Sequence, residues 1–226
     1  MGDAIGQVLS FGVGVALSPV PIVGVVLMLG TPRARSNGPA FIAGWIGGLA
    51  VVGTIVLLVS SGADASEQGK PADWVSVLKL VLGILVLVVA LRQWRARPAA
   101  GEQAVMPKWM QTIDAFNAGR ATAFGVLLSA VNPKNLLLTV GAAAAIAQTG
   151  ASAVDQAVAL AIFVLLGTLG VGTPVALYFA LGARSTRILD DLKQWMGAHN
   201  AAIMTVLCLV IGAKLIGDAI SGFAAL

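Results

Sequence analysis

A lysine next to a proline, near the middle of a bilayer-length apolar run, constrains this chain more than any other feature. The run covers about residues 121–148 and contains the segment Ser-Ala-Val-Asn-Pro-Lys-Asn at residues 129–135. A helix needs roughly 20 apolar residues to cross a bilayer, and a central lysine costs about 2.5–3.5 kcal/mol on insertion scales. Pro133 breaks the helix, and the freed backbone groups must bind protein, water or a ligand. The segment therefore predicts a binding site. The alternative is a proline kink whose lysine snorkels or pairs with a carboxylate.

The composition indicates an integral membrane protein. Of the 226 residues, 58% are hydrophobic and 11% are charged, whereas soluble domains carry about 25% charged residues. The net charge of +4 comes from basic residues scattered over short loops, which indicates membrane topology and not nucleic-acid binding. Cys208 is the one cysteine, which excludes an internal disulfide. The N-terminus lacks the basic region of a cleaved signal peptide, so we expect the first apolar run to stay in the mature protein.

The apolar runs predict six membrane spans in an all-helical fold. Span one is expected to break at Pro19 and Pro21, and span four at Pro133. Span five is expected to be interrupted at Pro174. The predicted spans are residues 5–30, 39–60, 74–94, 121–148, 157–182 and 201–223.

Lysine and arginine gather in alternate loops. Loops two and four contain only Lys70. Because loops rich in lysine and arginine stay in the cytoplasm, we expect both termini outside it. The basic residues in or beside the odd loops are Arg33, Arg35, Arg92, Arg95, Arg97, Lys108, Arg120, Arg184, Arg187 and Lys193.

Two of the predicted cytoplasmic segments carry amphipathic patterns. In the linker at residues 99–120, Trp109, Met110, Ile113 and Phe116 recur at helical spacing. This pattern is typical of a helix that lies on a membrane surface. The last loop, residues 184–200, has its own apolar stripe, formed by Ile188, Leu189, Leu192, Trp195 and Met196.

The two halves of the chain resemble each other. Residues 17–21 (Leu-Ser-Pro-Val-Pro) echo residues 128–133 (Leu-Ser-Ala-Val-Asn-Pro), and residues 77–83 align without gaps on residues 206–212. Three spans per half is an odd number, so the second half must insert upside down. Inverted repeats with matching broken helices are an architecture of secondary transporters. We expect repeats at residues 1–98 and 121–226. The alternative is chance similarity between apolar helices.

Polar side chains beside the two breaks form the candidate substrate site. The ammonium of Lys134 and the free N–H groups of a half-helix start could hold an anion. Asn132 and Asn135 could form hydrogen bonds with an oxygen-rich head group. Ser129 and Ser18 lie beside the breaks and complete the candidate set.

Span six carries a charged pair. Lys214 and Asp218 are four residues apart and share a helix face. A structural ion pair and a functional one are both open. If the pair is functional, Lys214 is a second substrate-binding cation and Asp218 is the proton-coupling candidate, because intramembrane carboxylates form proton relays. Lys79, nearer the outer end of span three, is expected to snorkel to the interface. His199 is expected at the surface.

No residue pattern points to catalysis. The sequence lacks a His, Cys and carboxylate cluster with metal-ligand spacing, and it lacks a phosphate-cradling loop before a lysine. We therefore expect neither an enzyme nor a bound metal or cofactor.

Several short motifs carry a family resemblance. They are Arg92-Gln93-Trp94, Arg97-Pro98, Pro107-Lys108-Trp109-Met110, Gly119-Arg120-Ala121 and Asn132-Pro133-Lys134-Asn135-Leu136. With these motifs, and over essentially its whole length, the chain resembles the glycopeptidolipid-addressing (GAP) and sulfolipid-addressing proteins of the LysE superfamily. The resemblance implies a bacterial plasma-membrane protein that helps complex glycolipids or sulfolipids reach the cell surface. Many LysE-type amino-acid exporters have Pro-Gly-Pro in span one, whereas this chain has Pro19-Val20-Pro21, which argues against an amino-acid substrate.

Together these features predict a secondary-transporter-like protein that moves an anionic or polar-headed lipid outward. The expected partner is the membrane lipid itself, and envelope-lipid synthesis or export proteins could dock on the linker at residues 99–120. Two alternatives stay open: an exporter of a small polar metabolite, such as an amino acid or organic ion, and a non-transporting scaffold for the lipid machinery. A homodimer through the glycine-rich spans is also open, and no nucleic-acid partner is expected.

Overall fold

The fold is helical, as the apolar periodicity predicts. The computed structural model describes residues 2–62, 66–67, 70–71, 73–96 and 108–224. In this part of the chain the only strands are β1 (Ser66–Glu67) and β2 (Lys70–Pro71), which pair antiparallel. All other elements are helices, which confirms the all-helical fold.

The first apolar run forms two helices with a sharp bend between them. These are α1 (Gly2–Ala16) and α2 (Pro19–Leu29), bent by 52°. Pro19 and Pro21 have no N–H, so the carbonyls of Val15 and Leu17, four residues earlier, lose their helical donors. The helix therefore stops at the end of α1 and starts again at Pro19.

The fourth apolar run also bends, by 63°. It forms α5 (Ala118–Val126), a π-helical turn η2 (Leu127–Val131) and α6 (Pro133–Gln148). Asn132 sits between them: its N–H donates to the Leu127 carbonyl, and its side chain caps α6 by accepting from the Lys134 N–H. A proline at the first position of α6 suits this geometry, because the N–H it lacks would be unpaired there in any case.

In the described ranges, four helices are long and apolar enough to cross a membrane, and the count rises to six if each bent pair is one span. The four are α3 (Ala34–Gly62), α4 (Asp73–Arg95), α7 (Ala153–Leu181) and α8 (Ser185–Ala224). The chain is therefore a multi-pass membrane protein. Helix α8 runs through the segment at residues 184–200 that was expected to be a loop, and only the short turn η3 (Gly182–Arg184) separates it from α7.

The expected interruption at Pro174 is wrong. Helix α7 continues through Pro174 to Leu181. A proline inside a helix removes one hydrogen bond and crowds the carbonyl four residues earlier, which here belongs to Gly170. The helix packs along its length against α1, α2 and α3, and these contacts outweigh the loss at one residue.

The amphipathic segment before α5 packs into the protein. It forms a 3-10 helix, η1 (Lys108–Ala115), in which the side chain of Ile113 is fully buried. The Phe116 ring meets the Phe124 ring edge-on, and the Asn37 side-chain amide donates to the Phe116 carbonyl. These contacts attach the segment to the helix bundle, and its position at the membrane surface stays a prediction. The side chains of Trp109 and Met110, and all of residues 97–107, lie outside the described residues.

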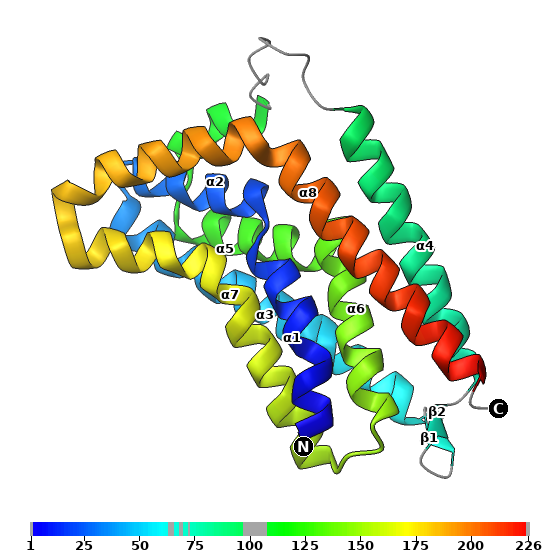
Figure 1. Cartoon of the computed structure of the whole chain (residues 1–226). Helices are drawn as coiled ribbons and strands as arrows, with labels where there is room; N and C mark the ends of the chain where they lie inside the picture. The colour runs from blue at the N-terminus through cyan, green and yellow to red at the C-terminus, as the bar shows by residue number, and fades with distance from the viewer. Residues whose placement is uncertain (1, 63–65, 68–69, 72, 97–107, 225–226) are drawn as a thin grey trace.

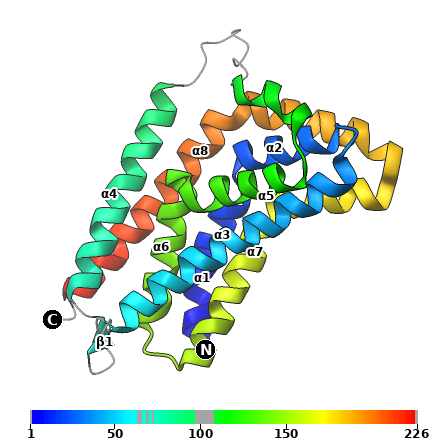
Figure 2. The same ribbon diagram turned by 180° about the vertical axis from the view of Figure 1, so that it is seen from behind.

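Helices α1 and α6 lie side by side in the middle of the molecule, and α4 runs along the C-terminal part of α8 (Figure 1). From behind, α3 crosses α5 (Figure 2). Glycines let these helices approach closely: an added Cβ at Gly44 would meet the Thr122 carbonyl, and one at Gly170 would meet the Ala16 carbonyl. Small residues at helix contacts are typical of membrane bundles.

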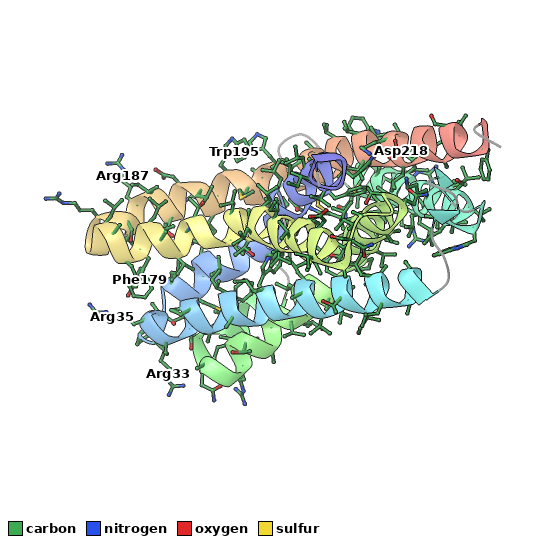
Figure 3. All side chains as sticks on the ribbon, turned by 90° about the horizontal axis from the view of Figure 1, so that it is seen from below. Arg33, Arg35, Phe179, Arg187, Trp195 and Asp218 are labelled. Atoms are coloured by element: carbon green, nitrogen blue, oxygen red, sulfur yellow. The ribbon has the colours of Figure 1, made fainter. Side chains whose placement is uncertain are left out.

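Arginines gather at one end of the molecule. Arg33, Arg35 and Arg187 lie at one end, and Asp218 lies toward the other (Figure 3). Between the ends, large apolar side chains are exposed on the outer helices. Examples are Leu58 on α3, Val81 on α4, Leu169 on α7 and Val210 on α8. Such a surface is suited to contact with lipid tails.

Candidate functional site

The two helix breaks meet at Lys134. Its side chain is 3% exposed and crosses from the start of α6 to the end of α1. There the ammonium Nζ donates to the carbonyls of Gly14 at 2.7 Å and Leu17 at 3.3 Å, and to the Ser18 hydroxyl at 2.7 Å. All three N–H donors of the lysine therefore have a protein acceptor.

The local sequence explains why the Lys134 side chain binds at the end of α1. The carbonyl of Leu17 lacks a helical donor because Pro21 has no N–H, and the Lys134 ammonium supplies one. The last turn of a helix also carries partial negative charge, so a cation is stabilised there. A residue of one half of the chain thus caps a helix of the other half.

The polar network continues from Ser18 into α6. The Ser18 Oγ lies 2.6 Å from the Val15 carbonyl and 2.9 Å from Oδ1 of Asn135. The amide nitrogen of Asn135 donates to the Leu128 carbonyl at 2.9 Å, beside the π-helical turn. Thr139, which the sequence did not single out, donates to the Asn135 carbonyl at 2.8 Å. The side chains of Ser18, Asn135 and Thr139 are all buried.

The remaining predicted site residues have local roles. Ser129 is buried and donates to the Val126 carbonyl at 3.2 Å, and its hydroxyl occupies the space beside Gly48. Asn132 caps α6 and holds the Lys134 N–H. Because the Lys134 N–H is bonded to Asn132 and Pro133 has no N–H, the first two residues of α6 offer no free backbone donor for an anion.

The positive charge of Lys134 is not paired. Among the described residues no carboxylate forms an ion pair with it, and its three partners are two carbonyls and one hydroxyl. A buried charge without a counter-ion is costly, and in membrane proteins such residues mark substrate or ion sites. The break reaches the molecular surface close by, because Val131 is 60% exposed. This site can therefore attract an anion.

Lys214 and Asp218 form a separate charged group. Their side chains meet at 2.6 Å and are 30% and 28% exposed. The Lys214 ammonium also lies 3.4 Å from Oε1 of Gln7 and 5.4 Å from the centre of the Phe11 ring, both on α1. Gln7 and Gly14 are seven residues apart, which places this group about 10 Å along α1 from Lys134. The structure therefore does not bring Lys214 into the Lys134 site.

Lys79 does not snorkel, contrary to the sequence-based expectation. Its side chain is 5% exposed. It shares a face of α4 with Ser76 and Gly83, and both of these residues contact α8. Lys79 is buried because this face of α4 packs against α8. The depth of a residue along its span does not reveal such a contact. His199 is exposed, with its ring stacked on Trp195.

No metal site is found in the described part of the chain, because no three His, Cys, Asp or Glu side chains there could hold an ion together.

A family model described as "Sap, sulfolipid-1-addressing protein" (SfLAP) matches residues 8–221. A search of curated proteins and a search of solved structures found no match. The matched region includes both helix breaks, Lys134 and the Lys214–Asp218 pair. Because the match covers nearly the whole chain, the protein belongs to the sulfolipid-1-addressing protein family.

Proposed function

We propose that this protein transfers an anionic or polar-headed lipid from the inner to the outer leaflet of the bacterial plasma membrane, with the Lys134 site receiving the head group. The observation that carries the proposal is the unpaired, buried ammonium at the meeting point of two broken helices. The family is named for addressing a sulfolipid, and a sulfate or phosphate group would supply the counter-ion that Lys134 lacks.

The proposed fold consists of six spans in two inverted halves, as in transporters of the LysE type. Each half has a bent helix pair followed by a 29-residue helix, α3 or α7, and then a further long helix. Contacts between the halves are also matched, since α3 packs on α5 and α7 packs on α1. Both termini would face outward, with Arg33, Arg35 and Arg187 at the cytoplasmic end.

Head-group binding would act on the contact between the halves. The ammonium of Lys134 now holds the end of α1 through Gly14, Leu17 and Ser18. A sulfate or phosphate group offers oxygens that replace these three acceptors, so the lysine keeps its hydrogen bonds and gains a counter-ion. The end of α1 is then released. Binding is thereby coupled to movement of one half against the other, which is how such transporters alternate access.

The other polar residues would support the exchange. Asn135 and Ser18 face the same point and can bond to head-group oxygens or to the α1 carbonyls. Asn132 keeps the start of α6 in place. The acyl chains would stay in the bilayer beside the exposed Val131, so that no wide aqueous pore is required.

The direct test is lipid transfer in proteoliposomes. A fluorescent anionic lipid is reduced by dithionite only in the outer leaflet, so its transfer rate can be measured with purified wild-type protein, Lys134→Met and Lys134→Arg. We expect Lys134→Met to lower the rate at least about tenfold, since tenfold corresponds to 1.4 kcal/mol of a charge interaction, and Lys134→Arg to retain part of it.

Lys193→Met is the matched control, because Lys193 pairs with Asp190 at the surface of α8. Size-exclusion profiles and melting temperatures establish that each variant is folded. Wild-type transfer by a folded Lys134→Met protein would contradict the proposal and favour the scaffold alternative. Transfer of a zwitterionic lipid as fast as the anionic one would contradict the role of charge.

A further inference from the structure

Helices α4 and α8 are held together closely on both sides of Lys79. An added Cβ at Gly222 would meet the Ser76 hydroxyl, and added Cβ atoms at Gly83 and Gly212 would each lie 3.1 Å from the other residue's carbonyl oxygen. The helices therefore run antiparallel here, and Lys79 lies between these contacts, at the level of Asp218 and Ala219. Lys79 is buried, yet no hydrogen-bond acceptor or ion-pair partner for it is found among the described residues.

Lys79 adds a second positive charge to the Lys214–Asp218 pair. Lys79 interacts electrostatically with both residues: Asp218 attracts its charge and Lys214 repels it. Lys214 is bonded to Asp218 and lies next to Gln7 of α1. Three helices thus contribute to one charged cluster, formed by Gln7, Lys79, Lys214 and Asp218. Two lysines against one aspartate leave this cluster with a net charge of +1.

We propose that the cluster formed by Gln7, Lys79, Lys214 and Asp218 is a second anion site, which takes a sulfate or phosphate group. Lys79 and Lys214 bind the anion, and Gln7 donates a hydrogen bond from its amide nitrogen. Asp218 is the internal counter-ion, which holds Lys214 while the site is empty and gives way when the anion arrives. This inference rests on the proposed function and adds a second binding site for the same head group.

The two sites lie on one face of α1. Gln7 and Gly14 follow each other at helical spacing on α1, and Ser18 follows the end of that helix. Gln7 contacts Lys214, whereas Gly14 and Ser18 contact Lys134. Between them lies Ser10, whose buried Oγ has no hydrogen-bond partner in the described structure. A polar head group that moves between Lys134 and Lys214 would form a hydrogen bond with this free hydroxyl. The second site lies nearer the end of the molecule where α1 begins and α8 ends (Figure 1), so it suits release of the head group.

The experiment measures binding of octyl sulfate to the full chain in phosphatidylcholine nanodiscs. Octyl glucoside is the uncharged control, and sodium sulfate tests for a free anion. The variants are Lys79→Gln, Lys214→Gln and Asp218→Asn, with Lys134→Met as the variant of the first site. We expect Lys79→Gln to weaken octyl sulfate binding about tenfold and Asp218→Asn to strengthen it several-fold, because the anion no longer competes with the carboxylate.

The sign of the Asp218→Asn effect separates the proposal from a purely structural ion pair. If Asp218→Asn weakens binding as much as Lys214→Gln does, while melting temperatures fall together, Asp218 is structural and the proposal is overturned. Equal binding of octyl glucoside and octyl sulfate also overturns it. Sodium sulfate binding that is lost in Lys79→Gln supports the site and assigns it to the anion without a lipid tail.

The Lys134→Met variant distinguishes this inference from the proposed function. If it abolishes lipid transfer and removes one octyl sulfate site, while a second site that depends on Lys79 remains, both proposals stand. If octyl sulfate binding depends on Lys134 alone and is unchanged in Lys79→Gln, the second site is excluded while the first remains.

Discussion

Gly83 and Gly212 contact each other reciprocally, because an added Cβ on either would lie 3.1 Å from the carbonyl oxygen of the other. The relation extends one turn further: the Cβ at Gly83 would also meet Ile216, and the Cβ at Gly212 would meet Leu87. These two glycines are the equivalent positions in the gapless match between residues 77–83 and 206–212. The similarity between the halves thus coincides with a local two-fold contact.

This contact predicts a steric effect at both glycines. Gly83→Ala and Gly212→Ala should each destabilise the protein by about 1–3 kcal/mol, because the added methyl group meets backbone and forces the helices apart. Thermal unfolding in detergent measures the effect. Gly217→Ala is the control, since nothing lies within 4 Å of its Cβ position and alanine favours the helix. A rise in melting temperature for Gly212→Ala would contradict the prediction.

The hydroxyls of two serines, Ser10 on α1 and Ser18 between α1 and α2, predict opposite effects. Ser18→Ala removes an acceptor of Lys134 and the partner of Asn135, and a buried polar group left without a partner costs about 1–3 kcal/mol. Ser10→Ala removes a buried Oγ that has no partner in the described structure, so the protein should keep or gain stability. Chemical or thermal unfolding of both variants tests this. Equal losses would show that the Lys134 network does not hold α1.

Asn37 should control the segment before α5. Its amide donates to the Phe116 carbonyl at 3.1 Å and is the described link between the start of α3 and the end of this segment. Asn37→Ala should raise hydrogen exchange and protease cleavage at residues 108–116 without unfolding the bundle, because local unfolding follows lost local contacts. The neighbouring exposed Ser36, which bonds only to its own turn, supplies the control Ser36→Ala. Unchanged exchange in Asn37→Ala would show that the packing of Ile113 and Phe116 fixes the segment without this hydrogen bond.

The predicted orientation can be tested by thiol labelling in intact cells. Cys208 is the one cysteine and is buried, so the wild-type protein should stay unlabelled. Val154 lies in the first turn of α7 and is 72% exposed, so Val154→Cys should react with a membrane-impermeant maleimide. Arg35→Cys should react only after permeabilisation, because basic loops stay in the cytoplasm. The reverse pattern would invert the topology.

Sequence reasoning succeeded where local rules decide the outcome. The apolar runs, with their low charge, predict a helical membrane protein without any tertiary information. The free-energy cost of placing Lys134 beside Pro133 in an apolar run also predicts a polar centre without tertiary information. The identity of its acceptors could not be predicted, since Gly14 and Leu17 contribute only backbone carbonyls, about 120 residues away in the chain. These two carbonyls can accept hydrogen bonds because Pro19 and Pro21 break the first apolar run at the depth of Lys134.

The sequence-based predictions were wrong where tertiary contacts outweigh the free-energy cost of a local feature. Pro174 was expected to interrupt span five, but contacts with three helices keep α7 continuous. Residues 184–200 were expected to be a loop with an apolar stripe, yet no proline occurs between residues 185 and 224, and α8 runs from Ser185 to Ala224 without a break. For Lys79, the signal was present but unused: Ser76 and Gly83, small residues three and four positions away, mark the face of α4 that packs against α8.

The Ser18 hydroxyl carries one proton but has two acceptors within reach, the Val15 carbonyl at 2.6 Å and Oδ1 of Asn135 at 2.9 Å. In one rotamer of the proton the bond stays inside the first half of the molecule, and in the other it ties that half to the second. No heavy atom has to move between these two states. A hydrogen bond within the first half and a hydrogen bond between the two halves therefore compete for the single proton of Ser18.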